Sequence, residues 1–141
     1  MAGMRRKLRQ KRRSECPLNA SVEALGDRWS LLIVRDLMLT DANTFAALQK
    51  SHEGIATNIL ADRLRKLTAE GIISAAPDPS DRRKRIYRLT AKGIALAPAL
   101  AELVLWAAAH EETGRQALIR EMRGNKREFL ARIARRWEKA R

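Results

Sequence analysis

The sequence predicts a mainly α-helical protein with one small β-hairpin. Through most of the 141-residue chain, apolar residues recur at intervals of three and four, which is the spacing of one helix face. Two short apolar stretches flank a turn rich in proline and aspartate at residues 77–81, as in a hairpin. Hydrophobic residues make up 45% of the chain, so we expect a folded domain rather than a disordered tail.

The first two helices are expected between residues 17 and 37. Pro17 stands where a helix can begin, and Gly26 is a natural end for that helix. Asp27 can cap the second helix. The core-facing stripe of the second helix has the i, i+3, i+4, i+8 spacing and consists of Trp29, Leu32, Ile33 and Leu37.

A short helix, a turn and a longer helix follow. The short helix is expected at residues 45–48, and the turn at residues 51–54. The longer helix is expected from Ile55 to Glu70, just before Gly71. Leucines on one side of this helix should pack against the core, whereas the opposite side carries polar groups that can hydrogen-bond to a partner.

The stretches at residues 72–76 and 86–89 predict the two strands of the hairpin. Their connection contains a basic run at residues 82–85 and is long for a tight turn, so we expect an extended basic loop, or wing. Thr90 should cap a fifth helix, which Pro98 should kink or restart.

The fifth helix is apolar nearly all round from Ile94 to Ala109. A helix of this kind must be buried on all sides, and a small domain can hardly achieve that alone, so a second copy of the chain is expected to cover it. The stretch is too short and too rich in alanine to span a bilayer, which needs roughly 20 residues. The sequence therefore predicts a dimer and no membrane partner.

The net charge of +13 indicates a polyanionic partner, with nucleic acid as the first candidate and an anionic membrane as the second. Aromatic residues are only 4% of the chain, which disfavours a stacking surface for single strands. Residues 1–14 are rich in lysine and arginine and contain no acid, so we expect a flexible basic arm. This arm could lie along DNA or remain solvated.

The order of these elements predicts a winged helix-turn-helix domain at residues 15–110. A helix fits the major groove, where each base pair shows a distinct hydrogen-bonding pattern, and a basic wing reaches phosphates or the minor groove. Residues 111–141 are expected to form a basic, amphipathic helical extension. Its apolar stripe, which suits a docking face better than a membrane anchor, consists of Phe129, Leu130, Ile133 and Trp137.

Candidate DNA-binding residues lie on the exposed face of the longer helix. Thr57 and Asn58 are near the N-terminal end, which usually enters the groove, and Asp62 and Arg65 follow on the same face. Arg63 lies nearer the packed side and could either reach a phosphate or buttress the helix. The wing residues expected to contact mainly phosphates are Arg82, Arg83, Lys84 and Arg85.

Features of an enzyme are lacking in the sequence, which has no paired carboxylates in an apolar setting, no nucleophile elbow and no phosphate-binding glycine loop. His52 and His110 are isolated, so neither a metal site nor a cofactor is expected. The single cysteine, Cys16, excludes an intrachain disulfide. No apolar run follows the basic start, so we expect a cytoplasmic, nucleoid-associated protein without a secretory signal.

The sequence also resembles the HxlR-type regulators. The resemblance begins at Cys16-Pro17-Leu18, continues through ALGDRWSLLIVRDL and GIATNILADRLRKLTAEGII, and resumes after the wing at LTAKG. It implies a dimeric winged-helix transcription regulator in which the N-terminal helix and the helix after the wing form the dimer contact. The residues then expected at this contact are Leu25, Trp29, Leu100, Leu103, Val104 and Trp106.

Three departures from the family pattern affect local contacts. Asp27 stands where the family often has glycine, and Thr44 and Ala47 replace a usual arginine and acid. Ala56 replaces a common serine, so a weaker N-cap is expected. The resemblance also makes Cys16 a candidate thiol sensor, because some family members use a cysteine before this proline in that way. The alternative is a small, half-buried cysteine without a sensing role.

The predicted function is therefore a DNA-binding transcription regulator, of the repressor type, that reads an operator with two half-sites. A small-molecule effector or a thiol modification is the candidate control. The alternative is an accessory protein that binds nucleic acid without sequence specificity through its basic arm and tail. Within DNA regulators, MarR-like proteins are the nearest alternative, since their wing and dimer helices are similar.

Overall fold

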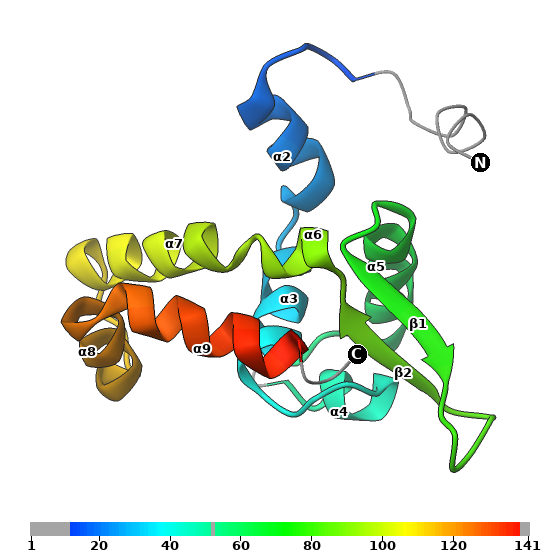
Figure 1. The fold of residues 1–141 in the computed structure, drawn as a ribbon. Coiled ribbons are helices and arrows are strands. Elements are labelled where there is room, and N and C mark those ends of the chain that lie inside the picture. Colours follow the sequence, from blue (N-terminus) through cyan, green and yellow to red (C-terminus); the bar gives the residue numbers. More distant parts are fainter. Residues whose placement is uncertain (1–11, 52, 139–141) are drawn as a thin grey trace.

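The computed structural model of the chain describes residues 12–51 and 53–138. The fold is mainly helical, with one two-stranded antiparallel sheet (Figure 1), as the sequence predicts. The helices are α2 (Pro17–Leu25), α3 (Ser30–Leu39), α4 (Phe45–Gln49), α5 (Thr57–Ala69), α6 (Ala91–Ile94), α7 (Ala97–His110), α8 (Gln116–Gly124) and α9 (Lys126–Glu138). The strands are β1 (Ile73–Pro77) and β2 (Arg85–Leu89).

The ends of the first helices follow the expected signals. Helix α2 begins at Pro17, and Gly26 is its C-cap. The carboxylate of Asp27 accepts hydrogen bonds from the backbone N–H groups of Trp29 and Ser30, both at 2.9 Å, so it satisfies donors that the start of α3 leaves open. Asp27 thus acts as expected on the backbone at the start of α3, although the residue at the N-cap position itself is Trp29.

Helix α5 is shorter than the predicted span from Ile55 to Glu70. It begins at Thr57 and ends at Ala69. Ala56 provides no side-chain cap, because its methyl group cannot accept a hydrogen bond. Gly71, with φ of +72°, then turns the chain into β1. The side of α5 expected to pack is buried, and it consists of Leu60, Leu64 and Leu67.

The hairpin pairs Ile73 with Leu89 at one end and Pro77 with Arg85 at the other. Strand β1 thus ends at Pro77, one position later than predicted. Its pairing partner Arg85 therefore belongs to β2, whereas the sequence suggested that Arg85 lies in the wing. Thr44 bridges to Ile86 on the free edge of β2. The segment before α4 therefore lies along the hairpin.

The core brings together α3, α5, the hairpin and the C-terminal helices. Many of its fully buried members lie on α3, on α5 and around the start of β1. They include Val34, Leu37, Met38, Leu60, Leu67, Ile72 and Ile73. Because α5 is packed on this core along its leucine side, its opposite side is left to face solvent.

The predicted fifth helix consists of two helices. Thr90 caps α6, since its hydroxyl accepts a hydrogen bond from the N–H of Gly93. The chain then breaks at residues 95–96, and α7 restarts with Pro98 in its first turn. Backbone N–H groups in the first turn of a helix have no partner within the helix. A proline, which lacks this group, therefore fits here without strain.

The C-terminal extension packs on the chain's own core. Helix α8 was not foreseen as a separate helix, and it lies against α7 together with α9 (Figure 1). Its buried side chains are Ile119 and Met122, and those of α9 are Phe129, Ile133 and Trp137. The expected docking face of the extension is thus occupied within the chain, and part of the apolar surface of α7 is covered without a partner.

One expected dimer residue on α7 is a core residue of the single chain. Leu100 is only 6% exposed, because the C-terminal helices and α3 pack around that side of α7. Leu103 and Trp106 lie on another side of α7 and are 51% and 61% exposed. Leu100 is therefore buried within the single chain, whereas Leu103 and Trp106 lie open at its surface.

The stretch Ala91–His110 is, among the described residues, one helical region long and apolar enough to cross a membrane by length and composition alone. It has 20 residues, because α6 leads almost directly into α7, so the expectation that the region is too short was wrong. A core helix passes the same test. Here Ala97, Leu100 and Ala101 are buried, but only 22% of the apolar stretch is buried within the structure.

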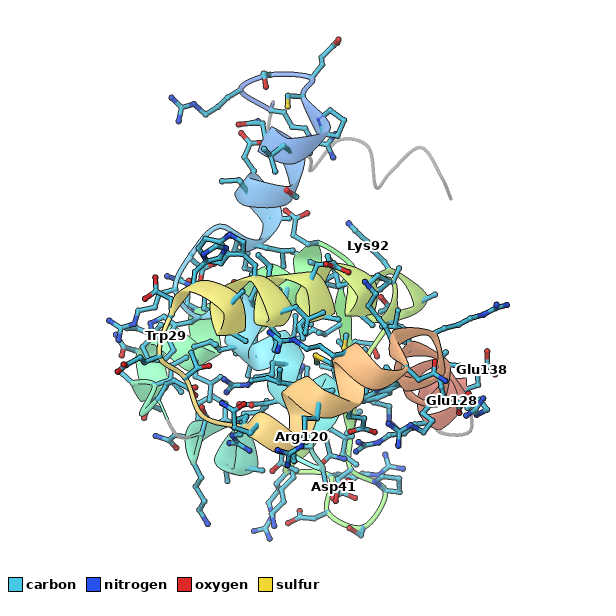
Figure 2. All side chains as sticks on the ribbon, turned by 90° about the vertical axis from the view of Figure 1, so that its left-hand side faces the viewer. Trp29, Asp41, Lys92, Arg120, Glu128 and Glu138 are labelled. Atoms are coloured by element: carbon cyan, nitrogen blue, oxygen red, sulfur yellow. The ribbon has the colours of Figure 1, made fainter. Side chains whose placement is uncertain are left out.

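Helix α2 stands away from the rest of the molecule. It extends beyond the body in both views (Figures 1 and 2), and none of its residues is buried. Its large apolar side chains Leu18 and Val22 are 72% and 55% exposed. An apolar helix face this open to water calls for a partner surface.

Candidate nucleic-acid interface

The outer face of α5 is polar and open. Thr57, Asn58, Asp62 and Arg65 are exposed, as the helical pattern predicts, and the side chain of Arg65 is 77% exposed. The hydroxyl of Thr57 accepts a hydrogen bond of 2.6 Å from Gln49 Nε2, which joins the end of α4 to the start of α5. The two helices of the helix-turn-helix are therefore linked beside the residues expected to enter a groove.

Arg63 is held by two carboxylates. Its Nε lies 3.0 Å from Asp27 Oδ1, and its Nη1 lies 2.5 Å from Asp62 Oδ2. The hydrogen bond to Asp27 is the main reason that the pKa of Arg63 is raised. Of the two alternatives left open by the sequence, this geometry supports the buttressing role, since the guanidinium is engaged across to the start of α3.

Asp27 is the centre of this contact. Besides capping α3, its carboxylate accepts a 2.5 Å hydrogen bond from the hydroxyl of Ser30 and lies 3.5 Å from Lys66 Nζ. Burial acts to raise the pKa of Asp27, but the hydrogen bonds from Ser30, from Trp29 and from Arg63 outweigh it and hold the pKa well below its ordinary value. The residue that departs from the family pattern thus ties α5 to the junction between α2 and α3.

A second ion pair holds the turn of the helix-turn-helix. Arg35 on α3 binds both carboxylate oxygens of Glu53, at 2.7 and 2.9 Å, and also contacts Asp36. The hydroxyl of Ser51 donates to Glu53 at 2.6 Å. The hydrogen bond from Arg35, followed by that from Ser51, lowers the pKa of Glu53 to about 2. Neither Arg35 nor Glu53 was singled out from the sequence, because no local pattern pairs residues 18 positions apart.

The wing is organised by its own acids. Asp78 accepts hydrogen bonds from the N–H and the hydroxyl of Ser80, both at 2.8 Å, and Asp81 pairs with Arg83 at 3.1 Å. The N–H of Asp78 also donates to the carbonyl of Lys84 at 2.8 Å, which closes the base of the loop. All four candidate basic residues of the wing are exposed: Arg82, Arg83, Lys84 and Arg85.

Half of the residues expected at a dimer contact are partly covered within the single chain. Leu25 and Trp29 are half-buried, as is Val104 on α7. The guanidinium of Arg28 lies 5.2 Å from the ring of Trp29, within cation–π range. The exposed apolar side chains Leu18 and Val22 were not among the residues expected at the dimer contact, although the amphipathic spacing of α2 could have indicated them.

Cys16 is exposed and precedes the first residue of α2. A thiol in this position is accessible to reagents, and it adjoins the helix that stands away from the body. Residues 1–11 of the expected basic arm and His52 lie outside the described residues. Within the described part of the chain, no group of three or more metal-ligating side chains comes together.

Comparisons with known proteins identify the domain. The sequence model of the family described as HxlR-like helix-turn-helix matches residues 24–115. The HTH-type transcriptional regulator YvaP of Bacillus subtilis is 34% identical over 93 residues, which are 65% of this chain and 85% of YvaP. The HTH-type transcriptional regulator YodB of the same organism is 33% identical over 93 residues, which are 65% of this chain and 82% of YodB.

Solved structures agree with the sequence matches. The structure of PA1607, described as a transcription factor, is 38% identical, with a TM-score of 0.67 over 74% of this chain and 72% of PA1607. The reduced form of YodB is 34% identical, with a TM-score of 0.58 over 72% of this chain and 99% of YodB. Helices α8 and α9 lie beyond the residues that the family model matches.

Proposed function

The chain belongs to the HxlR-like helix-turn-helix family of transcription regulators, and from this premise we propose that it binds double-stranded DNA as a homodimer. Helix α5 enters the major groove of each half-site, and the wing contacts phosphates beside it. The regulator acts as a repressor at an operator with two half-sites, within the cytoplasmic nucleoid.

The observation that carries this proposal is the pairing of two surfaces. The polar face of α5 is exposed while its leucine side is buried, and the hairpin beside α5 extends its basic tip beyond the body (Figure 1). Asn58 can pair with adenine, and Arg65 can bind guanine with two hydrogen bonds. Asp62 contributes only as an acceptor for cytosine, since a carboxylate repels phosphates.

The homodimer is supported by exposed apolar side chains on two helices. On α2 these are Leu18 and Val22, and on α7 they are Leu103 and Trp106. Burial of such residues against a second copy is favourable by about 25 cal/mol for each Å² removed from water. A twofold arrangement would place two α5 helices for two half-sites about one helical turn apart.

Control through Cys16 is the proposed regulation. The relative YodB has been solved in a reduced form, after diamide treatment and with bound quinone. In this chain Cys16 is exposed at the start of α2, one of the two helices proposed to form the dimer contact. Modification of the thiol would change the packing of α2 on its partner and thereby the spacing of the two α5 helices.

Fluorescence anisotropy tests the proposal with DNA from upstream of the protein's own gene and a scrambled duplex as control. Binding of the native duplex about a thousandfold tighter supports a regulator. Asn58→Ala and Arg65→Ala should reduce this preference, whereas Arg120→Ala on α8, far from α5 (Figure 1), removes a charge without affecting it. Retention of the full preference by both α5 variants would contradict the assignment of α5.

A non-specific accessory protein is the second candidate, and the net charge of +13 is the observation in its favour. In that case both duplexes bind alike, and their affinities fall together as salt is raised. The slope of log affinity against log salt concentration then gives the number of phosphates contacted, since each phosphate neutralised contributes about 0.9 to its magnitude.

A further inference from the structure

A cavity lies between the hairpin and the C-terminal extension. It has a volume of about 360 Å³ and is bounded by the end of α3 with its following loop, by β2 and by the end of α9. This volume lies within the range of sites for small molecules. One wall belongs to the matched winged-helix domain, and the other belongs to α9, which the family model does not match.

Trp137 of α9 lines the cavity and is 9% exposed. Its indole nitrogen is buried, and no hydrogen-bond partner for it exists among the described residues. Buried tryptophan N–H groups usually find an acceptor, because an unpaired donor removed from water raises the free energy of the folded state. The cavity therefore meets the ring of Trp137 and not its enclosed nitrogen.

Arg136 and Arg88 both line this cavity. Nη2 of Arg136 donates to the carbonyl of Thr40 and to the carboxylate of Asp41, both at 2.8 Å. The side chain of Asp41 is fully exposed, so its ion pair contributes little to stability. A carboxylate on a ligand can therefore replace that of Asp41 on Arg136 at small cost.

Beside its polar groups, the cavity also offers apolar and aromatic side chains. Tyr87 of β2 and Leu37 of α3 line the cavity together with the indole of Trp137. We propose that this cavity binds a small aromatic carboxylate. Its ring packs against Tyr87 and Trp137, and its carboxylate binds Arg136 in place of Asp41.

A ligand in this cavity would connect β2, which leads out of the wing, to the extension. Tyr87 is already tied to the loop before α4, since its N–H donates to the carbonyl of Asn43 at 2.8 Å. Ligand binding should thus change the position of the wing and the affinity for DNA. This consequence rests on the proposed function, whereas binding of the ligand itself does not.

NMR spectroscopy of the full chain, without DNA, tests the site. The chain has three tryptophans, and the spectrum of Trp137→Phe assigns the indole signal of Trp137. We expect benzoate, 4-hydroxybenzoate or phenylacetate to shift this signal saturably, because the ring of the bound acid lies against the indole. The signal of Trp106 should stay unchanged. Benzamide has the ring but no charge, and inorganic phosphate has the charge but no ring, so each should shift this signal far less.

Two variants that break the same ion pair separate ligand binding from the docking of α9. Arg136→Gln removes the proposed carboxylate partner and should weaken binding about tenfold or more. Asp41→Asn also breaks the pair but keeps the guanidinium and removes the competing carboxylate, so it should preserve or strengthen binding. Equal loss of affinity in both variants, or none in Arg136→Gln, overturns the proposal.

The proposal is also overturned if none of the three acids shifts the Trp137 signal saturably up to about 10 mM. It is overturned as well if phosphate or benzamide produces the same shift, because the site would then not recognise an aromatic acid. If the chain binds benzoate at Trp137 but binds no DNA, the ligand site stands and the proposed function is refuted instead.

Discussion

Helices α2 and α9 lie near opposite ends of the chain, and both carry an apolar stripe. The stripe of α9 is buried on the chain's own core, through Phe129, Ile133 and Trp137. In α2, by contrast, no residue is buried, and Leu18 and Val22 face water. Two similar patterns thus have opposite outcomes, which teaches that an amphipathic pattern indicates the need for a partner without identifying it.

The largest expected effect tests the packing of α9. Phe129→Ala should reduce the free energy of unfolding by about 3 kcal/mol, because it removes a buried ring and leaves a cavity. Urea denaturation at a fixed protein concentration measures this loss. A loss below about 1 kcal/mol would mean that α9 is not part of the cooperative core.

The second prediction tests α2 and α7 as partner-facing surfaces. Trp106→Ser, or Leu18→Ser on α2, should weaken the dimer about tenfold or more, because exposed aromatic and aliphatic side chains dominate such contacts. Sedimentation velocity over a range of concentrations measures the dissociation constant. The matched control is Leu130→Ser on α9, which should leave the dissociation constant unchanged. If the wild-type protein is a monomer at all concentrations, the exposed stripe of α2 does not bind a second copy of the chain.

The third prediction concerns the junction between α2 and the body. Asp27→Asn removes the charge that holds Arg63 and caps α3, and it should cost about 1.5 kcal/mol in free energy of unfolding. Thermal unfolding gives the loss. Arg65→Ala provides the contrast, since Arg65 is exposed and should affect DNA binding far more than stability. If the two variants lose equal stability, Arg63 is not the buttress of α5.

The smallest effect is a dependence of stability on pH. The folded-state pKa of Glu53, about 2, lies below its ordinary value of 4.5, so Glu53 binds fewer protons in the folded state. Its stabilising contribution is therefore fully present above pH 4.5 and is lost as the pH falls towards 2. Because the ion pair is partly exposed, we expect a contribution of only about 1 kcal/mol.

Unfolding of Glu53→Gln over this pH range measures the contribution. The difference in stability between wild type and variant should narrow as the pH falls. A difference that stays constant would show that Arg35 and Glu53 hold the turn no more tightly than a neutral hydrogen bond does.

The sequence predicts the helices with strong local signals. Leu60, Leu64 and Leu67 mark the buried side of α5, and Thr90 caps α6 as expected. Helix α8 escaped detection because its start carries no such signal: Arg115 precedes it in a left-handed conformation and provides no side-chain cap. A short helix without capping residues is stabilised mainly by packing, which periodicity alone does not reveal.

Within the candidate interface, exposed residues were predictable and paired residues were not. Asn58 and Arg65 follow from the helical pattern around the buried leucines. The ion pair between Arg63 and Asp27 joins residues 36 positions apart. Contacts at this separation depend on how the helices pack, so the sequence left the role of Arg63 open between a phosphate contact and a buttress.

The sequence by itself determined the winged helix-turn-helix order, the polar outer face of α5 and the basic tip of the hairpin. These features follow from local periodicity, capping residues and turn residues, which act over a few positions. Only the tertiary structure decided that α8 and α9 cover one side of α7, that Leu100 is a core residue, and that a cavity lies beside Trp137. The physical reason is that hydrophobic burial has no preferred direction, so an apolar stripe can be satisfied by any complementary surface within reach.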